Sequence, residues 1–340
     1  MTSILSKSRI NLSIDLAQKG RQIGDLHVKW SDNRRPLGVY PVPIACVAHG
    51  AGPTILLTGG VHGDEFEGPA ALMRLIQNLE LSEINGRVII MPALNAPALL
   101  DSSRVSPLDQ VNMNRAFPGD ADAGPTHMLA QFIEDILLPQ CDAVIDLHSG
   151  GKASVFAPCV LTQADTNSEI SAKNMALAKA FCAPYIWLSG KQNDDRSLNA
   201  AALRKGVPMV AAELGGGGGC DPVMANFAER ALRRCLKHLG IIEDAIAEDN
   251  EHSKLVEFRS AEQNFIAPAS GLFDRNFNLN DEVQADQAAG WLHFVGEPQR
   301  ASMELYFPIS GIIFAHGNRG MVERGESLAL IAQSAVTRTK

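Results

Sequence analysis

Short, almost entirely apolar segments alternate with segments of helical periodicity through much of this chain, and this alternation limits its fold most strongly. Thr54–Thr58, Arg87–Pro92 and Ala143–Leu147 have the length and composition of buried strands. Between the first two, Glu65–Leu79 places apolar residues at helical spacing. The alternation predicts an α/β domain with a largely parallel or mixed sheet.

Further segments extend this predicted domain. We expect strands at Val39–Val47 and Val207–Leu214, and helices near Pro125–Leu138 and Ser171–Phe181. The charged segment Glu243–Lys254 contains few apolar residues, so we interpret it as a linker to whatever follows.

The last eighty or so residues change to short strands and glycine turns. Pro268–Gly271 and, forty residues later, Pro308–Gly311 each precede an apolar strand, which indicates two similar halves. Two such halves would form a small barrel or sandwich that resembles the barrel-sandwich domains of biotinyl and lipoyl carriers, although no carrier lysine is evident between them. We therefore predict two domains, over residues 1–245 and 255–340.

Composition excludes several classes of protein. The chain has 340 residues, 46% of them hydrophobic and 20% charged, as in ordinary folded proteins. Its net charge of -8 gives no reason to expect nucleic-acid binding. No apolar run approaches the length that crosses a membrane, and the first residues lack the apolar core of a secretory signal. The six scattered cysteines are typical of reduced thiols in a cytoplasmic protein.

A histidine and a glutamate three residues apart follow the first apolar strand. His62 and Glu65 lie in the motif GGVHGDE, at the end of a strand where open α/β sheets bind ligands. Two histidines and one glutamate form one of the common ligand sets of catalytic zinc, with a fourth position left for water. In isolation, however, such a pair is more often a turn histidine and a helix-capping glutamate.

Two further strand ends strengthen the metal hypothesis. His148 ends the strand Ala143–Leu147 and runs into glycines, and Asp146 on the same strand face is a candidate supporting partner. Glu213 ends another strand and precedes five glycines, which suits a general base that activates water. A surface ion pair with a lysine is the ordinary alternative for this glutamate. The glycines would either approach a substrate closely or form a mobile loop.

The loop between these strand ends contains Asn114 and Arg115 within NMNRAFPG. Their amide and guanidinium groups are donors that can hold a carboxylate, and arginine can do so with two parallel hydrogen bonds. The commoner role of such a pair is a solvated loop with a salt bridge. The residues alone leave both interpretations open.

Four motifs in this order resemble the succinylglutamate desuccinylase/aspartoacylase family, which is related to the zinc carboxypeptidases. They are GGVHGDEFEG, NMNRAFPG, DLHSGG and AELGGGGG, and the resemblance covers roughly residues 54–220. It implies a zinc-carboxypeptidase-like mixed sheet flanked by helices. A small C-terminal β domain is also found in bacterial members.

Carried over by position, the family implies a role for each motif. One Zn²⁺ per chain would be held by His62, Glu65 and His148. Glu213 would be the general base and then the general acid. These four residues would form the centre of an amide hydrolase.

The resemblance also implies the residues that bind the substrate. Asn114 and Arg115 would hold its carboxylate. Arg104 resembles the arginine that polarises the scissile carbonyl and stabilises the oxyanion. It lies ten residues ahead of Asn114, a wider gap than in the most familiar members.

The implied reaction is hydrolysis of the amide bond of a small N-acyl amino acid, a linear non-peptide amide. The motifs look most like those of bacterial N-acetyl-diaminobutyrate deacetylases, so we expect an N-acetyl amino acid as substrate. The alternatives are an N-succinyl amino acid desuccinylase, a zinc carboxypeptidase acting on peptides, and a non-catalytic binding protein with a vestigial metal site. The sequence leaves open the acyl group, the metal used in the cell, the role of the C-terminal domain and the oligomeric state, and it allows a homo-oligomer.

Overall fold

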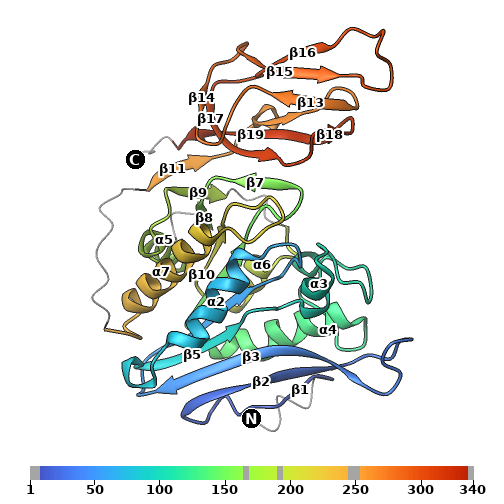
Figure 1. Ribbon diagram of the computed structural model, residues 1–340. Helices are drawn as coiled ribbons and strands as arrows, with labels where there is room; N and C mark the ends of the chain where they lie inside the picture. Colours follow the sequence, from blue (N-terminus) through green and yellow to red (C-terminus); the bar gives the residue numbers. More distant parts are fainter. Residues whose placement is uncertain (1–7, 164–167, 190–193, 244–252, 336–340) are drawn as a thin grey trace.

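The protein consists of a large α/β part and a group of strands at its C-terminal end (Figure 1). The computed structural model describes residues 8–163, 168–189, 194–243 and 253–335. One mixed sheet runs through both parts. None of the described helices is long and apolar enough to span a membrane.

The sheet of the α/β part is mixed, and its central strands are parallel. In spatial order its strands are β1 (Asn11–Leu12), β2 (Gly20–Lys29), β3 (Val39–His49), β5 (Gly86–Met91), β4 (Thr54–Gly59), β6 (Ala143–His148), β10 (Met209–Glu213), β8 (Cys159–Gln163) and β9 (Tyr185–Ser189). β5, β4, β6 and β10 pair in parallel, whereas β3 and β8 run antiparallel to the two ends of this group. The predicted α/β fold with a mixed sheet is confirmed.

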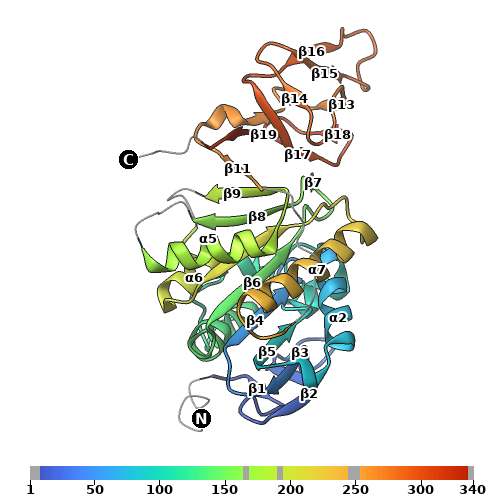
Figure 2. The ribbon, with the colours of Figure 1, turned by 90° about the vertical axis from the view of Figure 1, so that its left-hand side faces the viewer.

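Helices cover both faces of this sheet, and the turned view shows those of one face in front of its strands (Figure 2). One face carries α2 (Glu67–Asn78), α5 (Glu169–Phe181) and α7 (Pro222–His238). The other carries α3 (Ala96–Asp101), α4 (Pro125–Phe132) and α6 (Leu198–Lys205). The shorter helical turns are η1 (Leu81–Glu83), η2 (Met113–Arg115), η3 (Ile133–Leu137), η4 (Leu138–Gln140) and η5 (Ala261–Gln263).

The apolar composition of the central strands follows from this double cover. β4 and β6 are buried along their whole length. Successive side chains of a strand point to opposite faces, so Ile55 and Leu57 join the core under α2 while Leu56 joins the core on the other side. A strand that fills two cores therefore has no polar face, which is why its sequence is a continuous apolar run.

The predicted elements agree with the structure except in three places. The helix expected over Pro125–Leu138 is α-helical only to Phe132 and continues as the π-helical turn η3. Residues 244–252 of the expected linker lie outside the described residues, and Lys254, its last residue, begins a strand instead. The sequence also does not predict several elements of the α/β part, which are the strands β1, β2, β7 (Ser154–Phe156), β8 and β9 and the helices α3, α6 and α7.

The C-terminal strands belong to two sheets. They are β11 (Lys254–Glu257), β12 (Asn264–Ile266), β13 (Gly271–Arg275), β14 (Glu282–Val283), β15 (Ala288–His293), β16 (Met303–Tyr306), β17 (Gly311–Gly317), β18 (Met321–Val322) and β19 (Ser327–Ser334). β11 pairs with β9, and β19, β17 and β14 extend the main sheet beyond it. β16, β15, β13 and β18 form a separate antiparallel sheet.

The two similar halves of this C-terminal region pair crosswise. β13 pairs with β15, and β17 pairs with β19, within each half. In addition, β13 pairs with the short strand β18 of the second half, and β17 pairs with the short strand β14 of the first. Gly271 and Gly311 begin corresponding strands, and a Cβ atom would lie 2.7 Å from His293 O at the first and 2.5 Å from Ala332 O at the second. Each half therefore needs its glycine for the same close approach of backbone.

Aromatic side chains fill the junction between the two parts. Phe314 of β17 is fully buried, and its ring meets those of Phe156, Tyr185, Trp187 and Phe258 at steep angles. Such edge-to-face pairs are favourable beyond the apolar area that they bury. The junction is thus a packed core and is continuous with the sheet.

Replacing this central ring should destabilise the protein strongly. We expect Phe314→Ala to lower the free energy of unfolding by about 3–5 kcal/mol, because it leaves a cavity among four aromatic rings. Urea unfolding followed by circular dichroism measures the change. Leu37→Ala, at a fully exposed side chain, is the control and should change the midpoint little. A loss below about 1 kcal/mol in the Phe314 variant would contradict the packing described.

Candidate active site

Three neighbouring parallel strands end at one edge of the sheet and carry the predicted site residues there. Gly59 of β4 is paired with Leu147 of β6, and His148 of β6 is paired with Glu213 of β10. Because parallel strands point the same way, their carboxyl ends lie side by side. The turn after β4 continues to His62 and Glu65, which brings all three strand ends to one place.

His62, Glu65 and His148 form a buried cluster at this edge. Their potential ligand atoms all lie within 4.8 Å of one another. Nδ1 of His62 lies 2.7 Å from Oε1 of Glu65, and Nδ1 of His148 lies 2.9 Å from Oε2 of the same carboxylate. Two imidazole nitrogens and a carboxylate thus converge on one point, and this donor set can hold a divalent metal ion.

Each histidine is oriented through its outer nitrogen. Nε2 of His148 lies 2.7 Å from Oδ2 of Asp146, so the structure confirms the expected partnership of these two residues. The Thr58 hydroxyl donates to Oδ1 of the same aspartate at 2.6 Å. Nε2 of His62 lies 3.2 Å from Oδ1 of Asn112. A neutral ring whose Nε2–H is directed at such an acceptor presents the Nδ1 lone pair to a metal, the usual arrangement in histidine metal sites.

No pattern in the sequence marks Asn112 as a site residue. It stands two residues before Asn114 in NMNRAFPG, and its side-chain oxygen also accepts from the backbone N–H of Asn114 at 2.9 Å. Its neighbour His62 lies fifty positions away in the chain. An asparagine that caps a short turn looks the same in sequence whether or not a histidine packs against it.

Charge in the cluster is balanced internally. Burial disfavours ionisation of Glu65, but the charge of His148 and the hydrogen bonds with both histidines outweigh it and hold the pKa of Glu65 below its usual range. Burial likewise opposes protonation of His148, and the charges of Asp146 and Glu65 outweigh it and raise the pKa of that imidazole. The pocket therefore stabilises charge in a buried place, as a cation site requires.

Glu213 lies beside this cluster without being tied to it. Its Oε2 is buried and accepts no hydrogen bond from any residue in the described part of the chain. Burial raises the pKa of Glu213, and the positive charge of His148 offsets part of that effect. A surface ion pair does not account for this carboxylate. A buried carboxylate with a free oxygen at the edge of a donor cluster is suited to proton transfer.

Arg104 reaches the cluster from the loop after α3. Its Nη1 lies 3.4 Å from Oε1 of Glu65, while about half of the side chain is exposed. The loop is held against the turn of His62 by a hydrogen bond from the Gly63 N–H to the Ser103 carbonyl at 2.9 Å. A Cβ atom on Gly63 would lie 2.0 Å from the Ala98 carbonyl carbon, so only glycine allows this approach.

Asn114 and Arg115 lie on the neighbouring turn η2 and are both engaged. The side-chain oxygen of Asn114 accepts from the N–H of Leu198, the first residue of α6, at 3.0 Å. Arg115 directs Nε at Oδ2 of Asp194 at 3.0 Å and donates from Nη1 to the Asn114 carbonyl at 2.6 Å. Asp194 also pairs with Arg196. The structure thus adds Asp194 as an orienting partner that sequence motifs did not reveal.

The glycine run after Glu213 is a packed turn. Gly215–Gly218 all have positive φ angles, of 70°, 132°, 90° and 82°. The Gly215 carbonyl accepts from the N–H groups of Gly150 at 3.0 Å and Phe156 at 2.9 Å. These residues follow His148, so the run joins two strand ends to each other. Its approach to a substrate and its mobility stay predictions.

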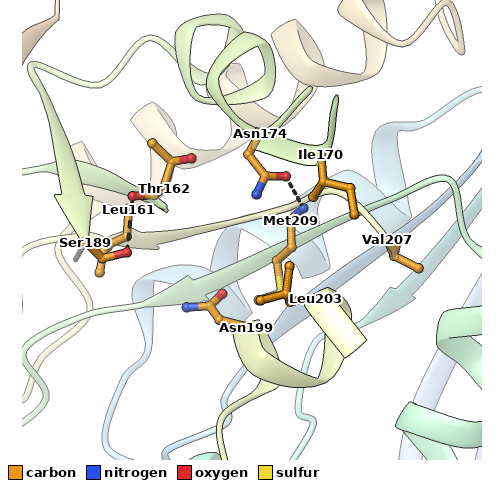
Figure 3. A pocket seen from close by; sticks show the side chains of 9 residues that line it. All are labelled: Leu161, Thr162, Ile170, Asn174, Ser189, Asn199, Leu203, Val207 and Met209. Carbon is orange, nitrogen blue, oxygen red and sulfur yellow. Dashed lines mark hydrogen bonds between the residues drawn. The ribbon is translucent and has the colours of Figure 1, made fainter. Parts of the chain in front are cut away.

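A small pocket lies away from the cluster, between β8, α5 and α6 (Figure 3). It contains Thr162, whose hydroxyl is buried with no hydrogen bond to the described residues, and Asn174, whose side-chain oxygen accepts from the Met209 N–H at 2.9 Å. Its volume is about 20 Å³. Sites for small molecules measure several hundred Å³, so this pocket is part of the core.

Comparison with known proteins agrees with the geometry. The sequence model of the succinylglutamate desuccinylase/aspartoacylase catalytic domain matches residues 51–239. The chain belongs to this family. A curated relative, the N-alpha-acetyl-L-2,4-diaminobutyric acid deacetylase of Halomonas elongata, is 33% identical over 326 residues, covering 96% of this chain and 95% of the relative.

Solved structures of family members superpose over nearly the whole chain. The succinylglutamate desuccinylase/aspartoacylase of Rhodobacter sphaeroides has a TM-score of 0.90 at 34% identity and covers 96% of this chain and 100% of its own. The product-bound ectoine utilization protein EutE (DoeB) of Ruegeria pomeroyi has a TM-score of 0.92 at 30% identity and covers 96% and 99%. The family relationship therefore includes the C-terminal strands.

Removing the partner of His148 should weaken metal binding. We expect Asp146→Asn to lower the affinity for a divalent metal ion about 10- to 100-fold, because the amide no longer fixes the ring through a charged acceptor. Competition with a chromophoric chelator measures the affinity. Asp25→Asn, on β2 four strands away from β6 in the sheet, is the control. Unchanged affinity in the Asp146 variant would count against the cluster as the metal site.

Proposed function

We propose that this protein is a zinc-dependent deacetylase of a small N-acetyl amino acid, with N-acetyl-2,4-diaminobutyrate as the first candidate. The observation that carries the proposal is the buried His62–Glu65–His148 donor set beside the unpartnered oxygen of Glu213. Family membership supports hydrolysis of an acyl amide, and the name of the Halomonas elongata relative supports the acetyl group.

The residues of the cluster fit a zinc ion. Two histidine nitrogens and a glutamate oxygen leave one coordination position for water or substrate, as catalytic zinc requires. When bound there, zinc would act as a Lewis acid that lowers the pKa of water and polarises the acyl carbonyl. Asp146 and Asn112 hold the two rings so that Nδ1 of each faces the metal position.

The proton transfers fall to Glu213. Its ionised carboxylate takes a proton from the attacking water, and the positive charge of a metal bound at the neighbouring cluster would favour that ionised form. The same carboxyl group then returns the proton to the amide nitrogen as the carbon–nitrogen bond breaks. The products are the free carboxylic acid and the free amine of the amino acid, so atoms and protons balance.

Two arginines and an asparagine provide the remaining contacts with the substrate. The Arg104 guanidinium lies beside Glu65, where it can donate to the oxygen that becomes negative during attack. Arg115 retains donors beyond those that contact Asp194 and the Asn114 carbonyl, and these can hold the substrate carboxylate. The Asn114 side-chain oxygen is engaged by α6, so its NH₂ group is what remains for the substrate.

The wider description of the protein belongs to the same proposal. We propose one zinc ion per chain, two domains over residues 1–245 and 255–340, and a cytoplasmic location. None of the six cysteines forms a disulfide bond with another described residue, which accords with a reducing compartment. The net charge of -8 accords with a small-molecule substrate and with no nucleic-acid or membrane partner.

Substitution of the proposed base should separate catalysis from metal binding. We expect Glu213→Gln to lower kcat by about 10²–10⁴-fold, because the amide cannot accept the proton of water. Zinc content, measured by elemental analysis, should stay at the level of the parent protein. Glu297→Gln, at an exposed side chain, serves as the matched control. Near-normal turnover in the Glu213 variant would remove this residue from the mechanism.

A substrate screen tests the proposed activity itself. The zinc-loaded protein is offered N-acetyl, N-succinyl and N-formyl amino acids and short peptides, and the released amine is measured with and without a chelator. We expect the N-acetyl diamino acid to be hydrolysed fastest and all activity to disappear with the metal. Preference for N-succinyl substrates would make the protein a desuccinylase, and release of amino acids from peptides would make it a carboxypeptidase.

A further inference from the structure

We propose that Asn318, in the C-terminal region, is a positioning residue for catalysis, which rests on the function proposed above. It fastens the loop that follows His148 to the glycine run that follows Glu213. The C-terminal strands would then support the active site directly, in addition to completing the sheet.

The backbone places Asn318 next to the active-site loops. β17 (Gly311–Gly317) pairs antiparallel with β7 (Ser154–Phe156), with Gly317 opposite Ser154. Both views show these two strands meeting where the C-terminal region joins the α/β part (Figures 1 and 2). Asn318 follows β17 directly, and its N–H donates to the Ala153 carbonyl at 2.9 Å. The ladder therefore delivers this side chain to the loop after His148.

The side chain of Asn318 bridges two segments far apart in sequence. Its Nδ2 donates to the Lys152 carbonyl at 3.3 Å and to the Gly217 carbonyl at 3.2 Å. An NH₂ group has two hydrogens, and both are used here on backbone carbonyls. The side chain thus behaves as a cross-link between the two loops. Its amide has no further donor for a substrate.

From this cross-link, backbone hydrogen bonds lead to the reacting residues. The Gly217 N–H donates to the Ser154 carbonyl at 3.0 Å, and the Gly150 N–H donates to the Gly215 carbonyl at 3.0 Å. One step further, the Leu214 N–H donates to the carbonyl of His148 at 2.9 Å. The last of these hydrogen bonds therefore joins His148, a proposed metal ligand, to the residue that follows Glu213, the proposed base.

The glycine run depends on such support because it has no side chains to pack. At Gly216 a Cβ atom would lie 2.4 Å from the Ser154 carbonyl oxygen and 2.8 Å from the Gly150 backbone, so the two loops touch through their main chains. Glycine also loses more conformational freedom on folding than any other residue. A run of glycines is held in one conformation only by hydrogen bonds to its backbone, and Asn318 supplies one of them.

The same loop is also hydrogen-bonded to the turn that carries Glu65. The Lys152 N–H donates to Oδ2 of Asp64 at 2.9 Å, and Lys152 Nζ donates to the Ser102 carbonyl at 2.6 Å. Asp64 is buried and immediately precedes Glu65. Displacement of the loop at Lys152 would therefore reach both the metal donors and the segment that presents Arg104.

Two substitutions of Asn318 test the proposal in the zinc-loaded full-length protein. Asn318→Ala removes both hydrogen bonds, and Asn318→Asp puts a carboxylate oxygen against two carbonyl oxygens. We expect kcat to fall about five- to thirtyfold in the alanine variant, the loss that one or two ordinary hydrogen bonds would produce, and further in the aspartate variant. KM, zinc content and the thermal midpoint should change little. Asn276→Ala, at an exposed asparagine that directly follows β13, is the matched control.

Hydrogen exchange provides a readout that does not depend on activity. Amides of residues 150–156 and 214–218 should exchange faster in both Asn318 variants, while those of β4 and α2 should keep their protection. Parent-like kcat and exchange in both variants would overturn the inference. Faster exchange across the whole protein, or a fall in the thermal midpoint that accounts for the lost activity, would assign Asn318 a merely structural role and also overturn it. If instead the parent protein hydrolyses no N-acyl amino acid, the proposed function fails, and the exchange data still show whether the cross-link exists.

Discussion

The parallel pairing of β4, β6 and β10 is the constraint on which the candidate site depends. Because His148 and Glu213 are register partners, the backbone ladder alone sets the proposed metal donor beside the proposed base. A slip of one residue would turn every side chain of a strand to the opposite face. The apolar side chains on both faces prevent that slip, since each would have to leave its core. The packing of the sheet thus determines the geometry of residues at its edge.

Burying the charged groups at that edge is costly, and the structure offsets the cost through contacts in successive layers. Glu65 lies between two imidazoles, Asp146 lies behind one of them, and the Thr58 hydroxyl lies behind Asp146. Each buried charge therefore has a partner, which is the condition under which such groups are tolerated. Glu213 differs from these residues, because one of its oxygens has no hydrogen bond from the described residues. Buried ionisable groups whose pKa is shifted in this way cluster at functional sites.

The sequence predicts best those elements whose local residue pattern directly causes their structure. β4, β5 and β6 are continuous apolar runs because they fill two cores. The sequence does not predict β2, because one face of this strand is largely exposed and its ten residues form a mixed polar segment. α7 was also missed, although Ala225, Ala228 and Leu232 recur at helical spacing and are buried. In that helix the apolar residues do recur with a period of about 3.6, which is the pattern that predicts a helix.

The sequence by itself determined which chemical groups stand at the strand ends: two histidines, a glutamate that completes the donor set and a further glutamate beside it. That information is local, since a residue at the end of an apolar strand occupies the edge of the sheet. Only the tertiary structure decided what holds those groups in place. Asn112 meets His62 across fifty positions, and Asn318 meets Gly217 across about a hundred. The partners of Asn318 are backbone carbonyls, which every residue possesses, so no motif could reveal them. The glycine run shows the same limit: its composition does not reveal the main chains from distant segments to which its backbone is hydrogen-bonded.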